Sequence, residues 1–185
     1  MALTYTPEKP EFGTHCVDFN LTSVADNKKY SLKDFTNGQP LLIMFICNHC
    51  PYVIAIEDRL VTLGHDLMKE DINIVAICSN DENSYPDDSF ENLKKRHKEK
   101  KYSFTYLHDQ DQSVAKKFGA VCTPDFFLYD SGLKLQYRGR LDDSWKNPEL
   151  VTERELYNAA ITLKNKKTIN QQIPSMGCSI KWRTN

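Results

Sequence analysis

The spacing of apolar positions along the chain changes at residue 50. Residues 41–46 form a short apolar run with branched side chains, which is typical of a buried β-strand. Cys50 is therefore predicted to lie at a strand-to-helix junction, and Pro51 suits the first helical position, where no N–H is needed. The apolar positions that follow recur at the intervals of an amphipathic helix; they are Val53, Ile56, Leu60, Leu63 and Leu67.

Two further patterns predict strands on either side of this junction. Residues 17–21 alternate apolar and polar positions, and residues 28–32 follow after a polar turn, which predicts an N-terminal β-hairpin. Residues 72–78 are dense in β-branched side chains and predict a central strand, which a helical crossover connects to strand 41–46.

The second half of the chain also alternates helices and strands. Asp88 with Glu91 matches the capping-box spacing at the start of a charged, mostly solvated helix. Thr152 with Glu155 does the same for the last helix. Gly132 lies where a hairpin turn favours a positive φ. In order, we expect the helix 88–100, a short strand 104–107, a helix from Asp111 that Gly119 stops, a hairpin of 126–129 and 133–137, and the helix from residue 152.

This order of elements predicts an α/β fold with a central mixed β-sheet and helices on both faces. A chain of 185 residues is long enough to bury one core, so we expect a single domain over residues 1–185. Residues 167–185 follow the last predicted helix and are expected to form a C-terminal tail.

Charge and hydropathy exclude several classes of partner. The chain has 24 basic and 25 acidic residues and a formal net charge of −1, so electrostatics give no reason to expect nucleic-acid binding. No stretch approaches the roughly 18 apolar residues of a membrane span, and the N-terminus lacks the pattern of a secretory signal. We therefore expect a soluble, cytoplasmic protein, with a homodimer as one alternative to a monomer.

The six cysteines are too few for a disulfide-scaffold protein of this length, and in a reducing compartment they are more often catalytic, metal-binding or buried. The first turn of a helix stabilises an anion, such as the thiolate of Cys50. Because the thiolate is the reactive form, Cys50 is the candidate nucleophile. His49 either lowers the pKa of this thiol or faces solvent. Cys16 and Cys78 adjoin predicted strands and are expected to be packing residues.

Several motifs together resemble one known family. They are Asp18-Phe19-x-Leu21, Ser31-Leu32-x-Asp34-Phe35, Cys47-Asn48-His49-Cys50-Pro51-Tyr52-Val53, Thr123-Pro124 before Asp125-Phe126-Phe127-Leu128, Arg138-Gly139-Arg140-Leu141-Asp142-Asp143 and Gly177-Cys178-Ser179-Ile180-Lys181-Trp182. Over nearly its whole length the chain resembles the thioredoxin-like superfamily, and within it the peroxiredoxin-like branch of AhpC/TSA (redoxin) domains. The resemblance implies a thioredoxin-like fold with an N-terminal β-hairpin extension.

The same resemblance implies roles for three residues near the presumed nucleophile. Pro124 would be the cis-proline that faces the active-site thiol. Cys122 would lie near the same site, or would be a small buried apolar residue. Arg140 would stabilise the thiolate or a developing negative charge, as an Arg does in peroxiredoxins, or would pair with Asp142 or Asp143.

Cys47 departs from the patterns of the superfamily. In thioredoxins the partner cysteine lies one helical turn after the nucleophile, where this chain has Val53. In typical peroxiredoxins a Thr stands at the position of Cys47. The departure from thioredoxins favours a peroxidase-like or single-thiol mechanism, in which a second cysteine resolves the oxidised nucleophile. The departure from the Thr-x-x-Cys arrangement of peroxiredoxins argues against peroxidase activity. The candidate resolving cysteines are Cys47, Cys122 and Cys178.

Two interpretations of the C-terminal tail remain open at this point. Pro174 and Gly177 could make it mobile enough for Cys178 to swing toward Cys50. Alternatively, Ile180 and Trp182 could dock on the domain and anchor the C-terminus.

The function that these observations favour is that of a thiol-dependent oxidoreductase without a cofactor. Its substrate would be a peroxide or a disulfide, and an external thiol such as thioredoxin or glutathione would restore the reduced form. One alternative is a soft-metal module that binds zinc or copper through Cys47, His49 and Cys50. The other is a catalytically silent thioredoxin-like interaction domain.

Overall fold

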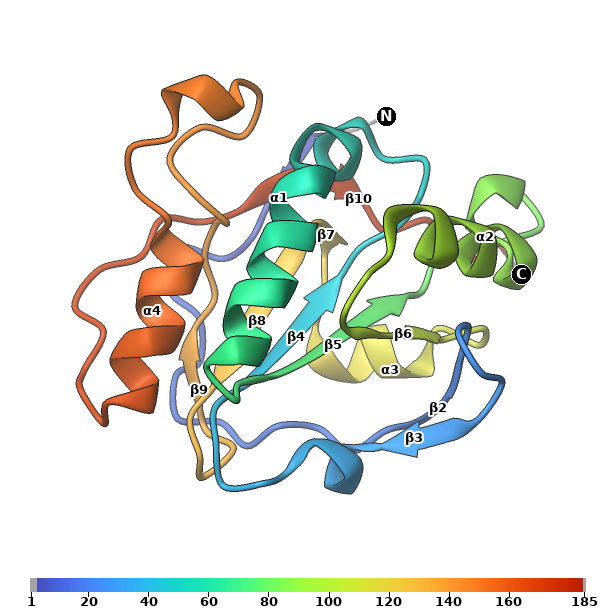
Figure 1. Cartoon of the computed structure of the whole chain (residues 1–185). Helices are drawn as coiled ribbons and strands as arrows, with labels where there is room; N and C mark the ends of the chain where they lie inside the picture. Colours follow the sequence, from blue (N-terminus) through green and yellow to red (C-terminus); the bar gives the residue numbers. More distant parts are fainter. Residues whose placement is uncertain (1–2, 185) are drawn as a thin grey trace.

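A seven-stranded mixed β-sheet runs through the centre of the molecule (Figure 1). The computed structural model describes residues 3–184. The strand order across the sheet is β3-β2-β6-β5-β4-β8-β9, in which β4 runs parallel to β5 and antiparallel to β8. The strands are β2 (Asn20–Ser23), β3 (Lys29–Ser31), β4 (Leu41–Phe45), β5 (Asn73–Cys78), β6 (Thr105–His108), β8 (Asp125–Tyr129) and β9 (Leu135–Tyr137).

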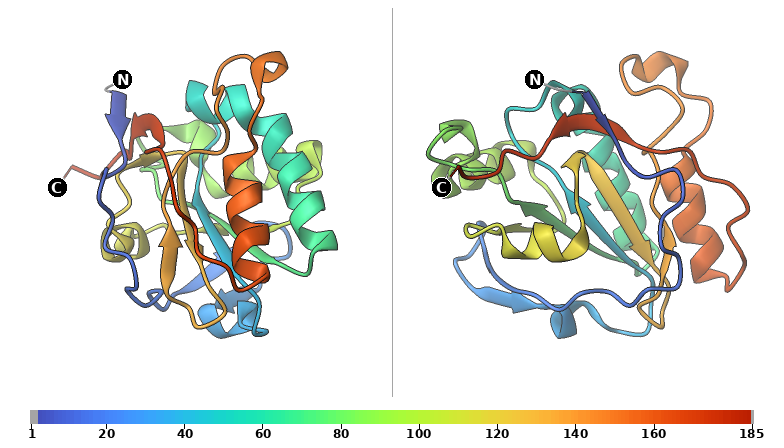
Figure 2. Two further views of the ribbon diagram at one scale, coloured as in Figure 1. Left: turned by 90° about the vertical axis from the view of Figure 1, so that its left-hand side faces the viewer. Right: turned by 180° about the vertical axis from the view of Figure 1, so that it is seen from behind.

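Helices cover both faces of this sheet, which confirms the predicted fold class (Figure 2). Helices α1 (Pro51–Lys69), α2 (Phe90–Lys100) and α4 (Glu155–Lys164) pack against one face, and α3 (Ser113–Phe118) packs against the other. Every residue of β4 is buried. Leu42 and Met44 face the hydrophobic core on the α1 side of the sheet, and Ile43 and Phe45 face the core on the α3 side. A strand that is covered on both faces has a continuous apolar sequence, and residues 41–46 have one.

A second, three-stranded sheet brings the two ends of the chain together. Strand β10 (Met176–Ser179) lies in its centre and pairs antiparallel with β1 (Leu3–Tyr5) and with β7 (Cys122–Thr123). Within the C-terminal tail, residues 176–179 are therefore a paired central strand rather than a segment that is free to swing. Ile180 is buried, in agreement with the anchored alternative, while Trp182 stays 40% exposed.

The local predictions hold with a few corrections. The N-terminal hairpin is present, with β2 paired antiparallel to β3. Neither predicted capping box forms, because α2 begins after Ser89 and α4 begins after Arg154. The hydroxyl of Thr152 instead contacts the carboxylate of Asp143. In the hairpin turn the positive φ of 58° belongs to Leu133, not to Gly132.

Three short 3₁₀ turns complete the described chain; they are η1 (Leu32–Phe35), η2 (Pro86–Asp88) and η3 (Pro148–Leu150). Of these, η2 matters for the site, because it ends on a buried carboxylate. Among residues 3–184 there is no helix long and apolar enough to cross a membrane.

Candidate active site

Cys50 is the N-cap residue of α1, at the junction that the sequence predicts. Its backbone is extended, with φ −72° and ψ 121°, and Pro51 opens the helix at a position that needs no N–H. The Cys50 carbonyl accepts the first hydrogen bond of α1, from the N–H of Ile54 at 2.9 Å. The sulfur therefore lies at the positive end of a helix of 19 residues, and it is fully buried.

Thr123 on β7 contacts two of the cysteines. The Cys50 thiol donates to the Thr123 carbonyl oxygen at 3.1 Å, and the Cys47 sulfur lies 3.3 Å from the Thr123 hydroxyl. The next peptide bond, Thr123–Pro124, is cis, as the resemblance implies.

Cys178 completes a cluster of three cysteines. Its backbone N–H and its thiol interact with the sulfur of Cys50 and influence its pKa, and so does the thiol of Cys47. These residues come from three different places in the fold: the connection after β4, the start of α1, and β10. All three side chains are buried.

These contacts decide which of the three cysteines ionises. Hydrogen bonds from the Cys47 thiol, and then from Cys178, lower the pKa of Cys50 to about 5, although burial opposes this. The bond from the Cys50 thiol to the Thr123 carbonyl favours the protonated form, but one acceptor is outweighed by several donors. A pKa of about 5 favours the thiolate form of Cys50 at neutral pH.

The two neighbouring cysteines keep their protons. Burial, and then the hydrogen bond to Cys50, raise the pKa of Cys178 to about 11. The same two causes, in the same order, raise the pKa of Cys47 well above its ordinary value, and the nearby charge of Asp88 adds to them. These shifts favour ionisation of Cys50 while Cys47 and Cys178 keep their protons.

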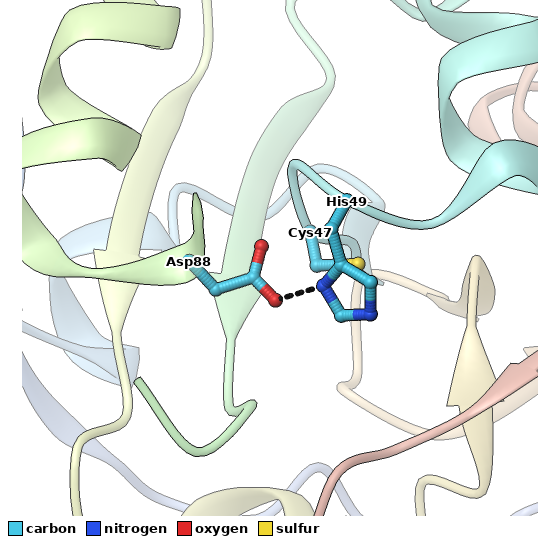
Figure 3. Close-up of side chains that lie close together, drawn as sticks. All are labelled: Cys47, His49 and Asp88. Carbon is cyan, nitrogen blue, oxygen red and sulfur yellow. Dashed lines mark hydrogen bonds and ion pairs between the residues drawn. The ribbon is translucent and has the colours of Figure 1, made fainter. Parts of the chain in front are cut away.

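His49 is held by a buried carboxylate (Figure 3). Its Nδ1 lies 2.6 Å from the Asp88 carboxylate, and its ring stacks on Tyr85 with centroids 4.7 Å apart. The same carboxylate accepts the N–H of Asn48 at 2.7 Å and the side-chain amide of Asn80 at 2.8 Å. The hydrogen bond to Asp88 raises the pKa of His49. Its Nε2 is buried and has no hydrogen-bond partner among the described residues.

Cys47, His49 and Asp88 are also the described residues whose donor atoms could hold a metal ion, since these atoms all lie within 4.8 Å of one another. Two of the three donors already bond directly to each other, through His49 Nδ1 and Asp88. This geometry fits an imidazole that is oriented by a carboxylate better than it fits an open ligand set.

The sequence matches the model of the AhpC/TSA family over residues 12–138. The chain belongs to the AhpC/TSA family. This match covers most of the central sheet and the cluster residues Cys47 and Cys50, whereas Cys178 lies beyond it. No curated relative matches the sequence at a significant level.

Solved structures similar to this AhpC/TSA protein include two with clear sequence similarity. An uncharacterized conserved protein from Geobacillus kaustophilus is 42% identical, with a TM-score of 0.94 over 100% of this chain and 98% of that one. A hypothetical protein from Sinorhizobium meliloti is 37% identical, with a TM-score of 0.91 over 96% of this chain and 98% of that one. Peroxidoxin BcpB from Mycobacterium tuberculosis is 16% identical, with a TM-score of 0.63 over 85% and 98% of the two chains, and shares the fold.

Two residues named from the sequence lie beside the cysteine cluster of this AhpC/TSA protein rather than in it. The sulfur of Cys122 donates to the Pro124 carbonyl oxygen at 3.5 Å, and burial raises the pKa of its thiol. Arg140 forms a two-point ion pair with Glu155, at 2.6 and 2.9 Å, instead of pairing with Asp142 or Asp143.

A cavity of about 160 Å³ adjoins the site. Its lining includes Tyr52, Pro124 and Met176, which are close in sequence to residues of the site, together with Arg140. Trp145 also lines this cavity, and its ring packs on Tyr52 with centroids 4.6 Å apart.

Sequence reasoning missed two residues of the site. Thr123 belongs to the Thr123-Pro124 motif, but its contacts with Cys47 and Cys50 depend on how β7 meets the start of α1 in space. The sequence predicts Asp88 as a helix cap, because its spacing to Glu91 is that of a capping box. No sequence pattern distinguishes that role from the contact with His49.

Proposed function

We propose that this AhpC/TSA protein is a thiol-dependent oxidoreductase whose nucleophile is the thiolate of Cys50. One observation supports this most strongly: Cys50 lies at the N-terminus of α1 and accepts hydrogen bonds that lower its pKa to about 5. A thiolate is the form that attacks peroxides and disulfides. The family to which the chain belongs fits the same class of chemistry.

The reaction with a hydroperoxide needs no further cofactor. The Cys50 thiolate attacks the terminal oxygen, the O–O bond breaks, and the leaving alkoxide or hydroxide takes up a proton. Cys50 becomes a sulfenic acid as the peroxide is reduced by two electrons. With a disulfide substrate, the thiolate attacks one sulfur and forms a mixed disulfide, while the other sulfur leaves as a thiolate and takes up a proton. In either case an external thiol of the thioredoxin or glutathione type restores the reduced protein.

His49 has a supporting electrostatic role in this proposal. Asp88 favours the charged imidazolium, and a positive charge next to Cys50 in the sequence favours the thiolate. Pro124 lines the cavity beside Thr123, whose carbonyl contacts the Cys50 sulfur. Arg140 is paired with Glu155 and lines the cavity. Its positive charge therefore lies at the cavity and not at the Cys50 sulfur.

The experiment compares two cysteine variants in one assay. Consumption of hydrogen peroxide is measured with dithiothreitol as reductant, and reduction of a model disulfide is measured in parallel. We expect Cys50→Ser to abolish both activities. The matched control Cys16→Ser should retain them, because Cys16 packs against the core on the other face of the sheet, the face that α3 covers. Full activity in Cys50→Ser would overturn the assignment.

Metal analysis separates this proposal from a metal-binding role. Protein purified without a chelator is dialysed, and its zinc and copper content is measured. The redox proposal predicts less than stoichiometric metal. Stoichiometric metal that is lost in His49→Ala would instead favour the cluster of Cys47, His49 and Asp88 as a metal site.

A further inference from the structure

The cavity of about 160 Å³ takes its walls from segments that also surround Cys50. Tyr52 lies on the first turn of α1, two residues after Cys50. Pro124 follows Thr123, whose carbonyl contacts the Cys50 sulfur, and Met176 begins β10. A group bound in this cavity therefore lies against the residues that enclose the nucleophile, without entering the buried cysteine cluster.

The cavity has a buried apolar floor and a rim that solvent reaches. The floor is formed by Ile56, Phe126 and Leu141, which are no more than 7% exposed. At the rim, Trp145 is 38% exposed and Ile173 is 46% exposed. A ligand can enter from solvent at the rim, and its apolar surface loses water against the floor.

The size of the cavity matches one ring. A dry cavity of about 150 Å³ lined by apolar side chains holds a single benzene molecule. The volume of about 160 Å³ is therefore enough for one aromatic ring or a branched alkyl group of similar size. The rings of Tyr52 and Trp145 add aromatic surface to this space, with centroids 4.6 Å apart.

The charged side chains in the described lining already have partners. Arg140 is paired with Glu155 at 2.6 and 2.9 Å, and the Asp142 carboxylate accepts a hydrogen bond from Arg59 at 2.5 Å. The Asp143 carboxylate accepts three hydrogen bonds from the chain just before α4. A charged ligand would lose its hydration here without gaining an ion-pair partner, so the lining favours an uncharged ligand.

Arg59 holds the loop that forms one wall of the cavity. It lies on α1, at a neighbouring cavity, and its guanidinium donates to the carbonyl oxygens of Ser144 and Trp145, each at 2.7 Å. With the bond to Asp142, one side chain makes three contacts with this short loop. These contacts fix the backbone of Trp145, whose ring packs on Tyr52.

We propose that this cavity binds one uncharged, ring-sized apolar group of the substrate, and that Arg59 is a positioning residue which forms the site by fixing Trp145. The link to the substrate rests on the proposed function of Cys50. The binding of the apolar group itself needs no reactive thiol, so the two are tested separately.

Fluorescence of Trp145 tests the binding site. The chain has two tryptophans, so Trp182→Phe leaves Trp145 as the only one. Benzyl alcohol, which carries one uncharged ring, is titrated into the full, reduced chain of this variant. We expect a saturable shift of the emission to shorter wavelength, because the bound ring excludes water from the indole. In the control Trp145→Phe, where Trp182 reports, we expect no saturable shift. An absent shift, or the same shift in both variants, would overturn the site.

The charge of the ligand is tested with the same ring. Benzoate and benzylammonium replace benzyl alcohol in the titration of Trp182→Phe. We expect both ions to bind about tenfold more weakly or worse, because each must lose its hydration in the cavity. Equal or tighter binding of either ion would contradict a site for an uncharged group.

Arg59→Lys tests the positioning role. A lysine keeps the charge that pairs with Asp142, but its single ammonium does not reproduce the planar fork that also bonds to two carbonyl oxygens. We expect benzyl alcohol to bind at least about threefold more weakly in this variant. The matched control Arg154→Lys, at the same neighbouring cavity, should bind it as before. Unchanged binding in Arg59→Lys would overturn the role of Arg59.

Two uncharged disulfides test the link to Cys50. At pH 7, 4,4′-dithiodipyridine carries one ring on each sulfur, whereas bis(2-hydroxyethyl) disulfide carries none. The rate at which each forms a mixed disulfide on Cys50 is measured by mass spectrometry of the tryptic peptide 34–59. We expect Trp145→Ala to lower the ratio of the two rates, ring-bearing over ring-free, by about fivefold or more. The same substitution at the other tryptophan, Trp182→Ala, should leave this ratio unchanged.

The outcomes separate this inference from the proposed function. An unchanged ratio in Trp145→Ala would show that the cavity does not select the substrate, even if Cys50 reacts with both disulfides. If Cys50 reacted with neither disulfide in the wild-type protein, the proposed function would fail and the link to the substrate would fail with it. The fluorescence titration would still decide whether the cavity binds an uncharged ring.

Discussion

The buried carboxylate of Asp88 bonds to Nδ1 of His49 at 2.6 Å and so determines how the imidazole faces the cysteine cluster. Asp88 ends the turn η2, whereas His49 precedes α1, so two separate connections of the fold meet at this contact. The carboxylate is fixed in turn by the N–H of Asn48 and the amide of Asn80. The imidazole is therefore oriented before any substrate arrives.

Asp88→Asn tests this contact. We expect the pKa of His49 to fall, because an amide does not favour the imidazolium as a carboxylate does. In the wild-type protein the raised pKa of His49 stabilises the fold below the unfolded-state pKa of about 6.5, and this contribution is lost as the pH rises through the folded-state value. NMR titration of His49 and unfolding at several pH values measure both effects. The exposed neighbour Asp87→Asn is the matched control, and an equal effect there would contradict the account.

Cys47→Ala removes the thiol that contributes most to the lowered pKa of Cys50. We expect the pKa of Cys50 to rise from about 5, because the thiolate loses a hydrogen bond that favours it. The ultraviolet absorbance of the thiolate, followed as a function of pH, measures the shift, with Cys78→Ala as the buried-cysteine control. An unchanged titration would show that Cys47 does not donate to Cys50.

The lowered pKa of Cys50 also predicts how stability depends on pH. Its ionisation contributes fully above the unfolded-state pKa of about 8.5, and this contribution decreases as the pH falls toward about 5. The difference in the free energy of unfolding between the wild-type protein and Cys50→Ser should therefore shrink across this interval. A difference that stays constant with pH would contradict a thiolate in the folded state.

Gly177→Ala tests the docking of β10. The added Cβ meets backbone atoms of Thr123, which cannot move aside as a flexible side chain can, so we expect a loss of about 1–3 kcal/mol in the free energy of unfolding. Because β10 also supplies the Cys178 donors, the pKa of Cys50 should rise in the same variant. Gly132→Ala, in an exposed turn where the nearest atom belongs to the side chain of Asp130, is the control and should change neither quantity. A wild-type pKa of Cys50 in Gly177→Ala would indicate that β10 does not set it.

The segment behind the cis-proline is held by a buried ion pair. Arg138 contacts the Asp125 carboxylate at 2.8 and 3.2 Å, and its guanidinium lies over the ring of Phe127. We expect Arg138→Met to cost about 3–5 kcal/mol in the free energy of unfolding, because it leaves the Asp125 charge buried without a partner. Arg154→Met, which breaks a more exposed pair with Asp66, should cost less than about 1 kcal/mol. Equal losses in urea unfolding would contradict this distinction.

The sequence predicts the parts of the site that depend on local periodicity. The change of apolar spacing at Cys50 locates the strand-to-helix junction, since a buried strand and an amphipathic helix have different periods. The partners of Arg138 and Arg140 depend instead on which elements meet in space. Strand β10 is harder still to predict, because its four residues, Met-Gly-Cys-Ser, have no apolar alternation. It becomes a strand by pairing with β1 and β7, which lie far away in the sequence.

The pH dependence of Cys50 oxidation by hydrogen peroxide tests the central claim most directly. The rate is measured in the wild-type protein by mass spectrometry of the tryptic peptide 34–59, which contains both Cys47 and Cys50. The variant Cys47→Ser is used to assign the oxidised sulfur. A thiolate nucleophile with a pKa of about 5 predicts a rate that rises through pH 5 and is constant near neutrality. A rate that rises only near the ordinary thiol pKa of about 8.5, or oxidation at another cysteine while Cys50 remains reduced, would contradict the account.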